Sequence, residues 1–173
     1  MSEANPYTAP DADLGGGSDE LYQPRFLSFH GRIGRLRYLA YGFGLSMLLM
    51  LAIIPLIGAS ALMGGGSPES MGPVTMILVG IIYVAAIVVS IMFAKRRLND
   101  LNRSGWWCLL FLVPLVNFAI TIYILFFPGT QGSNNFGPAP AANSTGVLVL
   151  AWIMIGIPLL GIIAAIAIPA FVA

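Results

Sequence analysis

The feature that most constrains this chain is a set of four long apolar runs that carry almost no charge. They cover about residues 38–63, 73–94, 106–127 and 146–172. Each run reaches or exceeds the roughly 20 residues that a helix needs to cross a hydrocarbon core of about 30 Å. Because lipid offers no hydrogen-bonding partners to the backbone, helices are the expected structure of such runs. No ten-residue segments of alternating polarity appear, so the pattern does not indicate a barrel of strands.

The composition excludes the ordinary soluble classes. The chain is 58% hydrophobic and only 9% charged, with a mean hydropathy of +0.88. Soluble domains are about 45–50% apolar and about 25% charged. We therefore predict an all-α polytopic membrane protein with four transmembrane helices. Four uninterrupted apolar runs argue against the alternative, in which they are buried helices of a soluble protein.

Cysteine and histidine counts limit the chemistry. The chain has one cysteine, Cys108, and one histidine, His30. It cannot form an intramolecular disulfide or supply a zinc site, so we expect no metal or cofactor. No acidic residue lies inside an apolar run, and we expect His30 to be an interface residue and Cys108 an apolar filler. The sequence therefore does not predict an enzyme, and the net charge of +1 does not predict nucleic-acid binding.

The first 24 residues have the composition of a disordered tail. They are rich in proline and glycine and contain five acids: Glu3, Asp11, Asp13, Asp19 and Glu20. They hold too little apolar material to form a core. A secretory signal would begin with basic residues and continue with an apolar run, which this start does not.

The basic residues predict how the chain is threaded. All eight lysines and arginines lie in residues 25–37 and 95–103, whereas the loops at 64–72 and 128–145 carry no base. Basic loops stay in the cytoplasm, so the N-terminus and residues 95–105 are expected inside. With four crossings the loop at 128–145 lies outside and the C-terminus lies inside.

One alternative to this threading stays open. Pro114 and Asn117 could bend the third run into a re-entrant hairpin, which would keep residues 128–145 in the cytoplasm and reverse the fourth helix. The length of the run, about 22 residues, favours a single crossing. Aromatic rings prefer the membrane interface, and we expect Tyr38, Trp106 and Trp107 to be anchors there.

Residues 26–38 combine apolar and basic positions. Phe26, Phe29, Ile33 and Leu36 recur at spacings of three and four residues, and the arginines fall on the other side. This pattern predicts a short amphipathic helix in the headgroup layer, with arginines toward lipid phosphate. In the alternative, the arginines only set the threading.

A second polar stretch follows the second run. On a helical extension of that run, Arg96 and Arg97 stand four and three residues before Asp100 and would pair with it. Asp100 could also reach across to Arg32 or Arg35. Ser104 is a plausible N-cap for the next helix. A third stretch, residues 128–138, has turn chemistry throughout and is interpreted from physics alone as a connecting loop.

These three stretches, in this order, resemble the bacterial domain-of-unknown-function 805 family of inner-membrane proteins. The resemblance spans about Phe26–Pro140, and Arg-Arg-Leu-Asn-Asp with the later Ser-Gly-Trp-Trp is its most specific part. It implies a small helical membrane domain, which we place at residues 25–140, and it implies no activity. The fourth apolar run predicts a further helix over residues 141–173. Asn99 stands where the family usually has His, which argues against a proton-linked role at this position. Asn135 and Ala139 replace a frequent base and a frequent acid.

Residues 161–171 are similar to the membrane helix of type IV pilins. The usual leader site is absent before them, so pilus assembly is not predicted. Gly161 and Ala165 form a small-residue face that lets helices approach closely, and plain helix packing is the preferred interpretation. Asn117 is expected to bond a neighbouring helix.

The function that these observations favour is a non-catalytic scaffold, self-associating or bound to a partner, with a basic cytoplasmic face for anionic lipid or protein. The acidic tail could screen that face. The alternatives are a small oligomeric transporter or channel subunit, or a pilus-associated component. The candidate binding residues are Arg32, Arg35, Arg37, Arg96, Arg97, Asp100 and Arg103.

Overall fold

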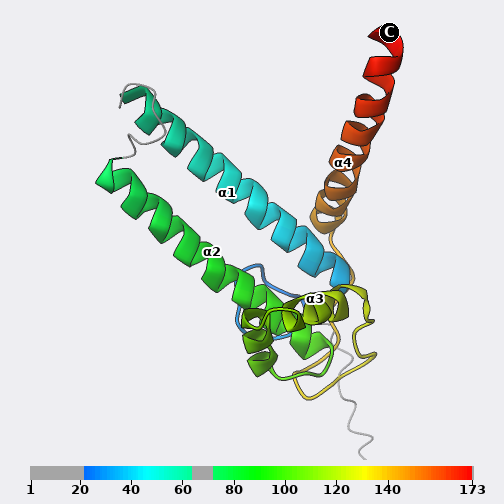
Figure 1. Cartoon of the computed structure of the whole chain (residues 1–173). Helices are drawn as coiled ribbons and strands as arrows, with labels where there is room; N and C mark the ends of the chain where they lie inside the picture. Colours follow the sequence, from blue (N-terminus) through cyan, green and yellow to red (C-terminus); the bar gives the residue numbers. More distant parts are fainter. Residues whose placement is uncertain (1–21, 64–71, 173) are drawn as a thin grey trace, which may run out of the picture.

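The computed structural model describes residues 22–63 and 72–172, and every element there is helical (Figure 1). The predicted disordered tail lies outside the described residues except for residues 22–24, and so does the predicted loop at 64–72 except for residue 72. The helices are α1 (Arg35–Met63), α2 (Pro73–Asp100), the 3-10 helix η2 (Gly105–Leu112), α3 (Val116–Phe126) and α4 (Thr145–Val172). Three of them, α1, α2 and α4, are long and apolar enough to cross a membrane.

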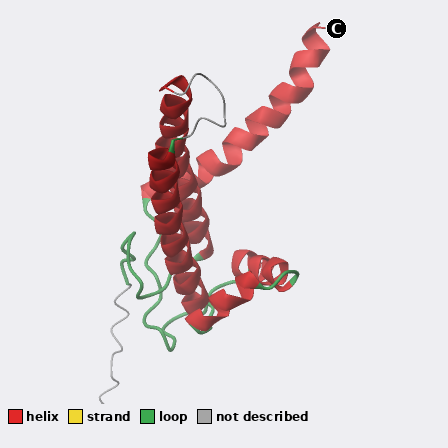
Figure 2. Cartoon of the chain, turned by 60° about the vertical axis from the view of Figure 1, so that its left-hand side comes forward, coloured by secondary structure: helices red, strands yellow, loops and turns green. Residues whose placement is uncertain are grey.

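At one end of the long helices lies a region of loops and short helices, which we call the head. It consists of residues 22–34, the end of α2 from Lys95, and residues 101–144. Helices α1 and α2 run antiparallel and side by side, while α4 contacts α1 near the head and then diverges from it (Figures 1 and 2). Val147 and Ala151 of α4 are buried at this contact. The outer faces of the long helices carry many exposed large apolar side chains, as expected for surfaces that face lipid.

The prediction that the third apolar run forms one crossing is wrong. The run is divided into η2 and α3, because Pro114 cannot donate a backbone hydrogen bond and Leu115 has a φ of 67°. With 11 residues, α3 is only about 16 Å long, far short of a bilayer core. Figure 2 shows the two short helices projecting together from the end of α2.

The two ends of the segment that contains η2 and α3 both lie at the end of α2. This arrangement is the one expected for a hairpin. The N–H of Arg103 donates to the carbonyl of Leu98 (2.9 Å), and that of Thr130 donates to the carbonyl of Asp100 (2.8 Å). The loop at 128–145 therefore packs against the end of α2, next to residues 95–105. Helices α1 and α4 both extend upward from the head in Figure 1, and they diverge from each other.

The amphipathic helix predicted over residues 26–38 is also wrong, because residues 22–34 are irregular and α1 begins at Arg35. Gly31 interrupts any helix there with a φ of 83°, and a Cβ at this position would overlap the ring of Tyr22. The N–H of Ile33 donates instead to the carbonyl of Arg96 (3.3 Å). This stretch is consequently a loop packed on α2.

Two small clusters form the core near the head. One consists of Ile33, Met92 and Phe93, and the other of Leu98, Ile120 and Ile124. Tyr38 packs against both clusters and is half-buried. Tyr38 thus has a packing role, and its role as an interface anchor stays a prediction.

The hairpin makes a direct prediction about threading. In a Cys108→Ser background, single cysteines at Arg25 and Gln131, both exposed, should react with a membrane-impermeant thiol reagent from the same side. A reporter fused after residue 173 should be active on the other side. Labelling of the two cysteines from opposite sides would contradict the hairpin and restore the single crossing.

Candidate functional site

A buried ion-pair network lies at the centre of the head. Asp100 is the last residue of α2, and its side chain is only 4% exposed. Its Oδ1 accepts hydrogen bonds from Nε (3.2 Å) and Nη2 (3.0 Å) of Arg32, and its Oδ2 accepts one from Nη1 of Arg97 (2.7 Å). The predicted pairing of Asp100 with Arg97, and its reach to Arg32, are both confirmed. The network joins two segments that are 68 residues apart in the sequence.

Arg32 also binds the loop at 128–138. Its Nη1 donates to the carbonyls of Gly132 (2.7 Å) and Gly137 (3.2 Å), and its Nη2 donates to the carbonyl of Thr130. One guanidinium thus uses its fixed fork of donors to hold a turn-rich loop that has little apolar surface of its own.

Arg97 holds the hairpin in the same way. Its Nε donates to the carbonyl of Ile124 (2.7 Å), and its Nη2 donates to the carbonyl of Phe127. These two carbonyls lie at the C-terminal end of α3, where the last backbone acceptors of a helix have no intrahelical donor. The arginine caps the helix and ties it to α2.

The loop at 128–138 does more than connect two helices, because it forms hydrogen bonds with the last residues of α2. Both the N–H and the Oγ1 of Thr130 donate to the carbonyl of Asp100 (2.8 and 2.7 Å). The Nδ2 of Asn134 donates to the carbonyl of Asn99 and to Oγ1 of Thr130, both at 2.8 Å. A Cβ at Gly129 would overlap the Asp100 carboxylate. Thr130, Asn134 and Gly129 were missed from the sequence, although the repeated turn residues were the signal that could have found them.

Two further arginines are buried without a carboxylate. Nη1 of Arg96 donates to the carbonyls of Arg25 (2.8 Å) and Phe26 (3.3 Å), and Nη2 of Arg37 donates to the carbonyl of Ala142 (2.9 Å). The predicted pairing of Arg96 with Asp100 is wrong, since its side chain points to residues 25 and 26 instead. Within residues 22–63 and 72–172, Nη1 of Arg37 and both Nε and Nη2 of Arg96 have no hydrogen-bond partner.

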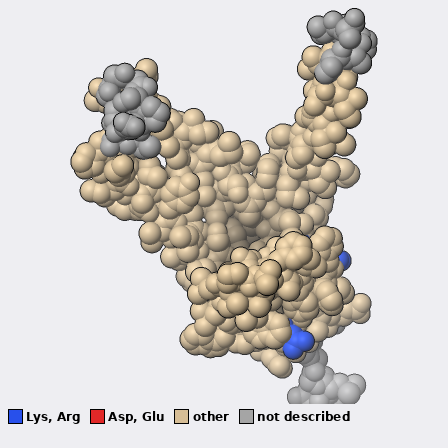
Figure 3. Space-filling view, viewed as in Figure 1, with Lys and Arg blue, Asp and Glu red and all other residues tan. Residues whose placement is uncertain are grey.

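The predicted basic face is therefore largely internal. Of its seven residues, five are buried: Arg32, Arg37, Arg96, Arg97 and Asp100. The physical reason is that the guanidinium groups of the four buried arginines find hydrogen-bond acceptors inside the protein, namely loop carbonyls and the Asp100 carboxylate. Arg35 and Arg103 remain exposed. In Figure 3 only a few basic atoms reach the visible surface, all at the head.

The other predicted site residues have more local roles. The Arg103 guanidinium lies 5.1 Å from the centre of the Trp107 ring, which is half-buried, whereas Trp106 is 79% exposed. Ser104 accepts a hydrogen bond from the N–H of Trp106 (3.4 Å), which confirms the predicted N-cap. Oδ1 of Asn117 accepts from Thr121 within α3, not from a neighbouring helix.

Gly161 and Ala165, the predicted packing pair, are both exposed on α4. No side chain of the described chain lies within 4 Å of a Cβ built at Gly161. The predicted packing face is thus not used within this single chain.

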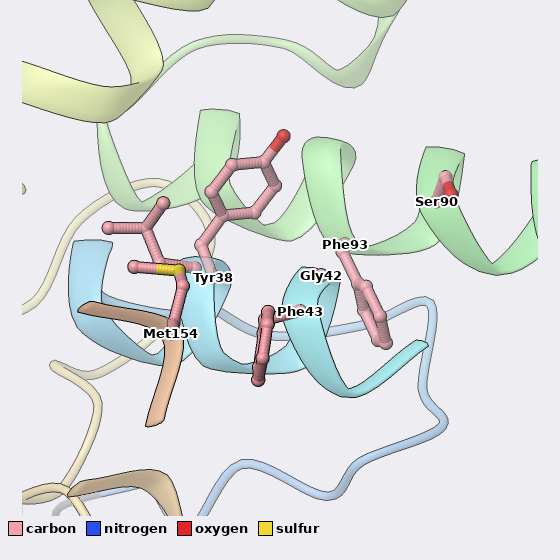
Figure 4. A pocket seen from close by; sticks show the side chains of 7 residues that line it. Tyr38, Gly42, Phe43, Ser90, Phe93 and Met154 are labelled. Atoms are coloured by element: carbon pink, nitrogen blue, oxygen red, sulfur yellow. The ribbon is translucent and has the colours of Figure 1, made fainter. Parts of the chain in front are cut away.

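Among the cavities in the described part of the chain, two concern the head and its junction with the long helices. A polar one of about 530 Å³ lies between α1, α3 and the loops, and we call it the Arg35 pocket; its lining residues are Gly34, Arg35, Leu36, Leu39, Asp100, Leu125, Gly129 and Asn143. An apolar one of about 260 Å³ lies where α1, α2 and α4 meet (Figure 4). Apart from the Tyr38 and Ser90 hydroxyl groups, its lining is apolar: Tyr38, Leu39, Gly42, Phe43, Ser90, Phe93 and Met154.

Fold and site together define a small helical membrane protein whose loops are held by a buried arginine–aspartate network. The chain belongs to the family described as "Protein of unknown function (DUF805)", which matches residues 26–138. It is 51% identical over 45 residues to the inner membrane protein YhaH of Escherichia coli K12, and 38% identical over 64 residues to the inner membrane protein YhaI of the same strain.

These matches cover 26% and 36% of this chain, and 37% and 54% of the respective relatives, so the chain spans about half or less of their lengths. No solved structure matches the chain. Together with its long apolar helices, the similarity to these two inner membrane proteins places this chain among inner-membrane proteins. The family match ends before α4, and the comparisons give the pilin-like resemblance of residues 161–171 no support.

Proposed function

We propose that this protein is a non-catalytic inner-membrane scaffold that binds an anionic phospholipid in the Arg35 pocket. The observation that carries the proposal is the composition of the pocket wall. The lining combines polar groups, the exposed Arg35 and the amide of Asn143, with the apolar side chains of Leu36, Leu39 and Leu125. A phospholipid likewise combines a polar headgroup with apolar acyl chains.

The charges around the pocket suit an anion. The Asp100 carboxylate borders it, but two arginines already neutralise that group, so the Arg32–Asp100–Arg97 network carries a net charge of +1. Nη1 of Arg35 donates to the carbonyl of Phe126 (2.9 Å), which holds the guanidinium at the pocket edge and leaves its other donors for a ligand. A base near an anionic leaflet is worth about 1 kcal/mol.

The proposed orientation follows from the same charges. All eight lysines and arginines lie in residues 25–37 and 95–103, and the fold places them in the head or in the first turn of α1 beside it. Basic segments remain on the cytoplasmic side, so the head and the N-terminus would face the cytoplasm. The C-terminus would then lie on the opposite side of the membrane, since α4 leaves the head in the direction of α1.

Lipid binding can be measured on detergent-purified protein by native mass spectrometry, with phosphatidylglycerol against phosphatidylethanolamine. We expect the unaltered chain to retain phosphatidylglycerol preferentially. Arg35→Gln should reduce that retention about fivefold, which corresponds to the loss of about 1 kcal/mol. The matched control is Arg25→Gln, which removes an exposed arginine that does not line the pocket. Equal losses in both variants would show a general charge effect and would refute the pocket.

A further inference from the structure

An apolar cavity of about 460 Å³ lies between α2, η2 and the start of α1, and we call it the η2 pocket. Its volume is within the range of about 300–1,000 Å³ that is typical of small-molecule sites. Within residues 22–63 and 72–172, none of its lining residues is charged, and none of them also lines the Arg35 pocket. A ligand of the η2 pocket would therefore be uncharged, and its binding would be separate from that of the proposed phospholipid.

The lining of the η2 pocket includes apolar side chains that are also exposed on the outer surface. On α2 these are Ile87 and Ile91, which are 57% and 48% exposed, and on η2 they are Leu109 and Leu112, which are 55% and 79% exposed. Helix α2 is one of the helices that are long and apolar enough to cross a membrane. An exposed apolar rim of this kind suits hydrocarbon better than water. A ligand would consequently reach the pocket from the lipid and would itself be dissolved in the membrane.

The polar groups of this lining are the hydroxyl groups of Tyr38 and Ser90 and the thiol of Cys108. Within the described part of the chain, neither of these hydroxyl groups donates a hydrogen bond to the protein. The hydroxyl groups of Ser46 and Ser60, by contrast, each donate to a carbonyl of the preceding helical turn (3.0 and 2.8 Å). A hydroxyl group away from water is unfavourable without an acceptor. Both pocket hydroxyl groups would therefore gain from an acceptor oxygen on a ligand.

Tyr38 and Ser90 reach the η2 pocket from two different helices. Figure 4 shows the Tyr38 ring extending from α1 toward α2, which carries Ser90. Both residues also line the apolar cavity where α1, α2 and α4 meet, so they lie between the two cavities. Phe111 of η2 adds a second aromatic ring to the lining. Aromatic side chains pack well against another flat ring.

We propose that the η2 pocket binds a quinone that is dissolved in the membrane. A quinone ring is flat and uncharged, and its two carbonyl oxygens supply acceptors for the hydroxyl groups of Tyr38 and Ser90. Its apolar tail would extend past the exposed Leu109 and Leu112 into the lipid. A phospholipid headgroup would bring charge into a lining that has none, and an acyl chain would offer neither hydroxyl group an acceptor.

Cys108 makes the binding measurable on the full-length chain in detergent, because it is the only cysteine and lines the pocket. Its alkylation by a membrane-permeant maleimide is followed by mass spectrometry at alkaline pH, since burial raises the pKa of this thiol. The probes are a fully substituted decylbenzoquinone, whose ring has no carbon open to a thiol, and decylbenzene, which has the same tail but no carbonyl. We expect the quinone to protect Cys108 at about tenfold lower concentration than decylbenzene.

Two variants test the hydrogen bonds themselves. Tyr38→Phe keeps the ring and removes the hydroxyl group, and Ser90→Ala removes the other hydroxyl group. Each should weaken protection by the quinone about fivefold and leave protection by decylbenzene unchanged. Ser46→Ala is the matched control, because it removes an exposed hydroxyl group of α1 that does not line the pocket.

The rise in Tm that each probe causes is a second measurement, which does not require Cys108 to react. We expect the quinone to raise the Tm of the unaltered chain more than decylbenzene does at the same concentration. Equal action of the two probes would overturn the proposal and indicate a cavity that accepts any apolar molecule. An undiminished preference for the quinone in the double variant Tyr38→Phe, Ser90→Ala would overturn it as well.

Discussion

Replacing Asp100 with Asn is expected to destabilise the protein by about 3–5 kcal/mol. The substitution removes the carboxylate shared by Arg32 and Arg97 while both arginines stay fully buried. The Asn side chain also has an NH2 group in place of one carboxylate oxygen, so one arginine would lose its acceptor and face another donor. Breaking a buried ion pair on one side leaves an uncompensated charge, which is why the effect exceeds that of a surface pair.

The measurement is thermal or denaturant unfolding in detergent, with the amount of protein in the membrane fraction as a second readout. The control is Arg103→Gln, which removes an exposed cation from a neighbouring turn and should cost less than about 1 kcal/mol. If Asp100→Asn were as stable as this control, the buried network would not hold the head together.

Gly129→Ala should have the second largest effect, a loss of about 1–3 kcal/mol or more from overpacking. The new methyl group would overlap the Asp100 carboxylate, which cannot rotate away without breaking its contacts with Arg32 and Arg97. We expect lower stability together with a loosened loop at 128–138, measurable as faster proteolysis or hydrogen exchange there.

Gly34→Ala is the matched control for this effect. Gly34 is also in the head, but a Cβ there would meet nothing within 4 Å. The control should leave stability within about 0.5 kcal/mol of the unaltered chain. Similar losses in both variants would indicate that alanine is poorly tolerated anywhere in the head, and would refute a specific contact between residue 129 and Asp100.

Sequence patterns predicted the structure correctly wherever the contacts that determine it join residues close in sequence. The apolar runs predicted α1, α2 and α4, the spacing of Arg97 and Asp100 predicted their pair, and Ser104 was recognised as an N-cap. The reach of Asp100 to Arg32 was also anticipated, because a single acid among so many bases has few alternatives.

Two expectations failed because the deciding contacts are distant in sequence. The periodicity of residues 26–38 fits a helix, but Gly31 and the carbonyl of Arg96 hold part of that stretch as a loop. The third run has the length of a crossing, but Arg97 and Asp100 draw its far end back to α2. Neither contact can be read from a hydropathy pattern.

The sequence by itself determined that the chain lies in a membrane, that its bases gather on one side, and that it belongs with a recognisable family. Those properties depend on composition and residue order alone. Long apolar helices are stable in the hydrocarbon core, and basic loops remain on the cytoplasmic side. Only the tertiary structure decided that most of these arginines are internal. Burial of a guanidinium depends on which carbonyls and carboxylates surround it, and here those partners come from segments up to about a hundred residues away.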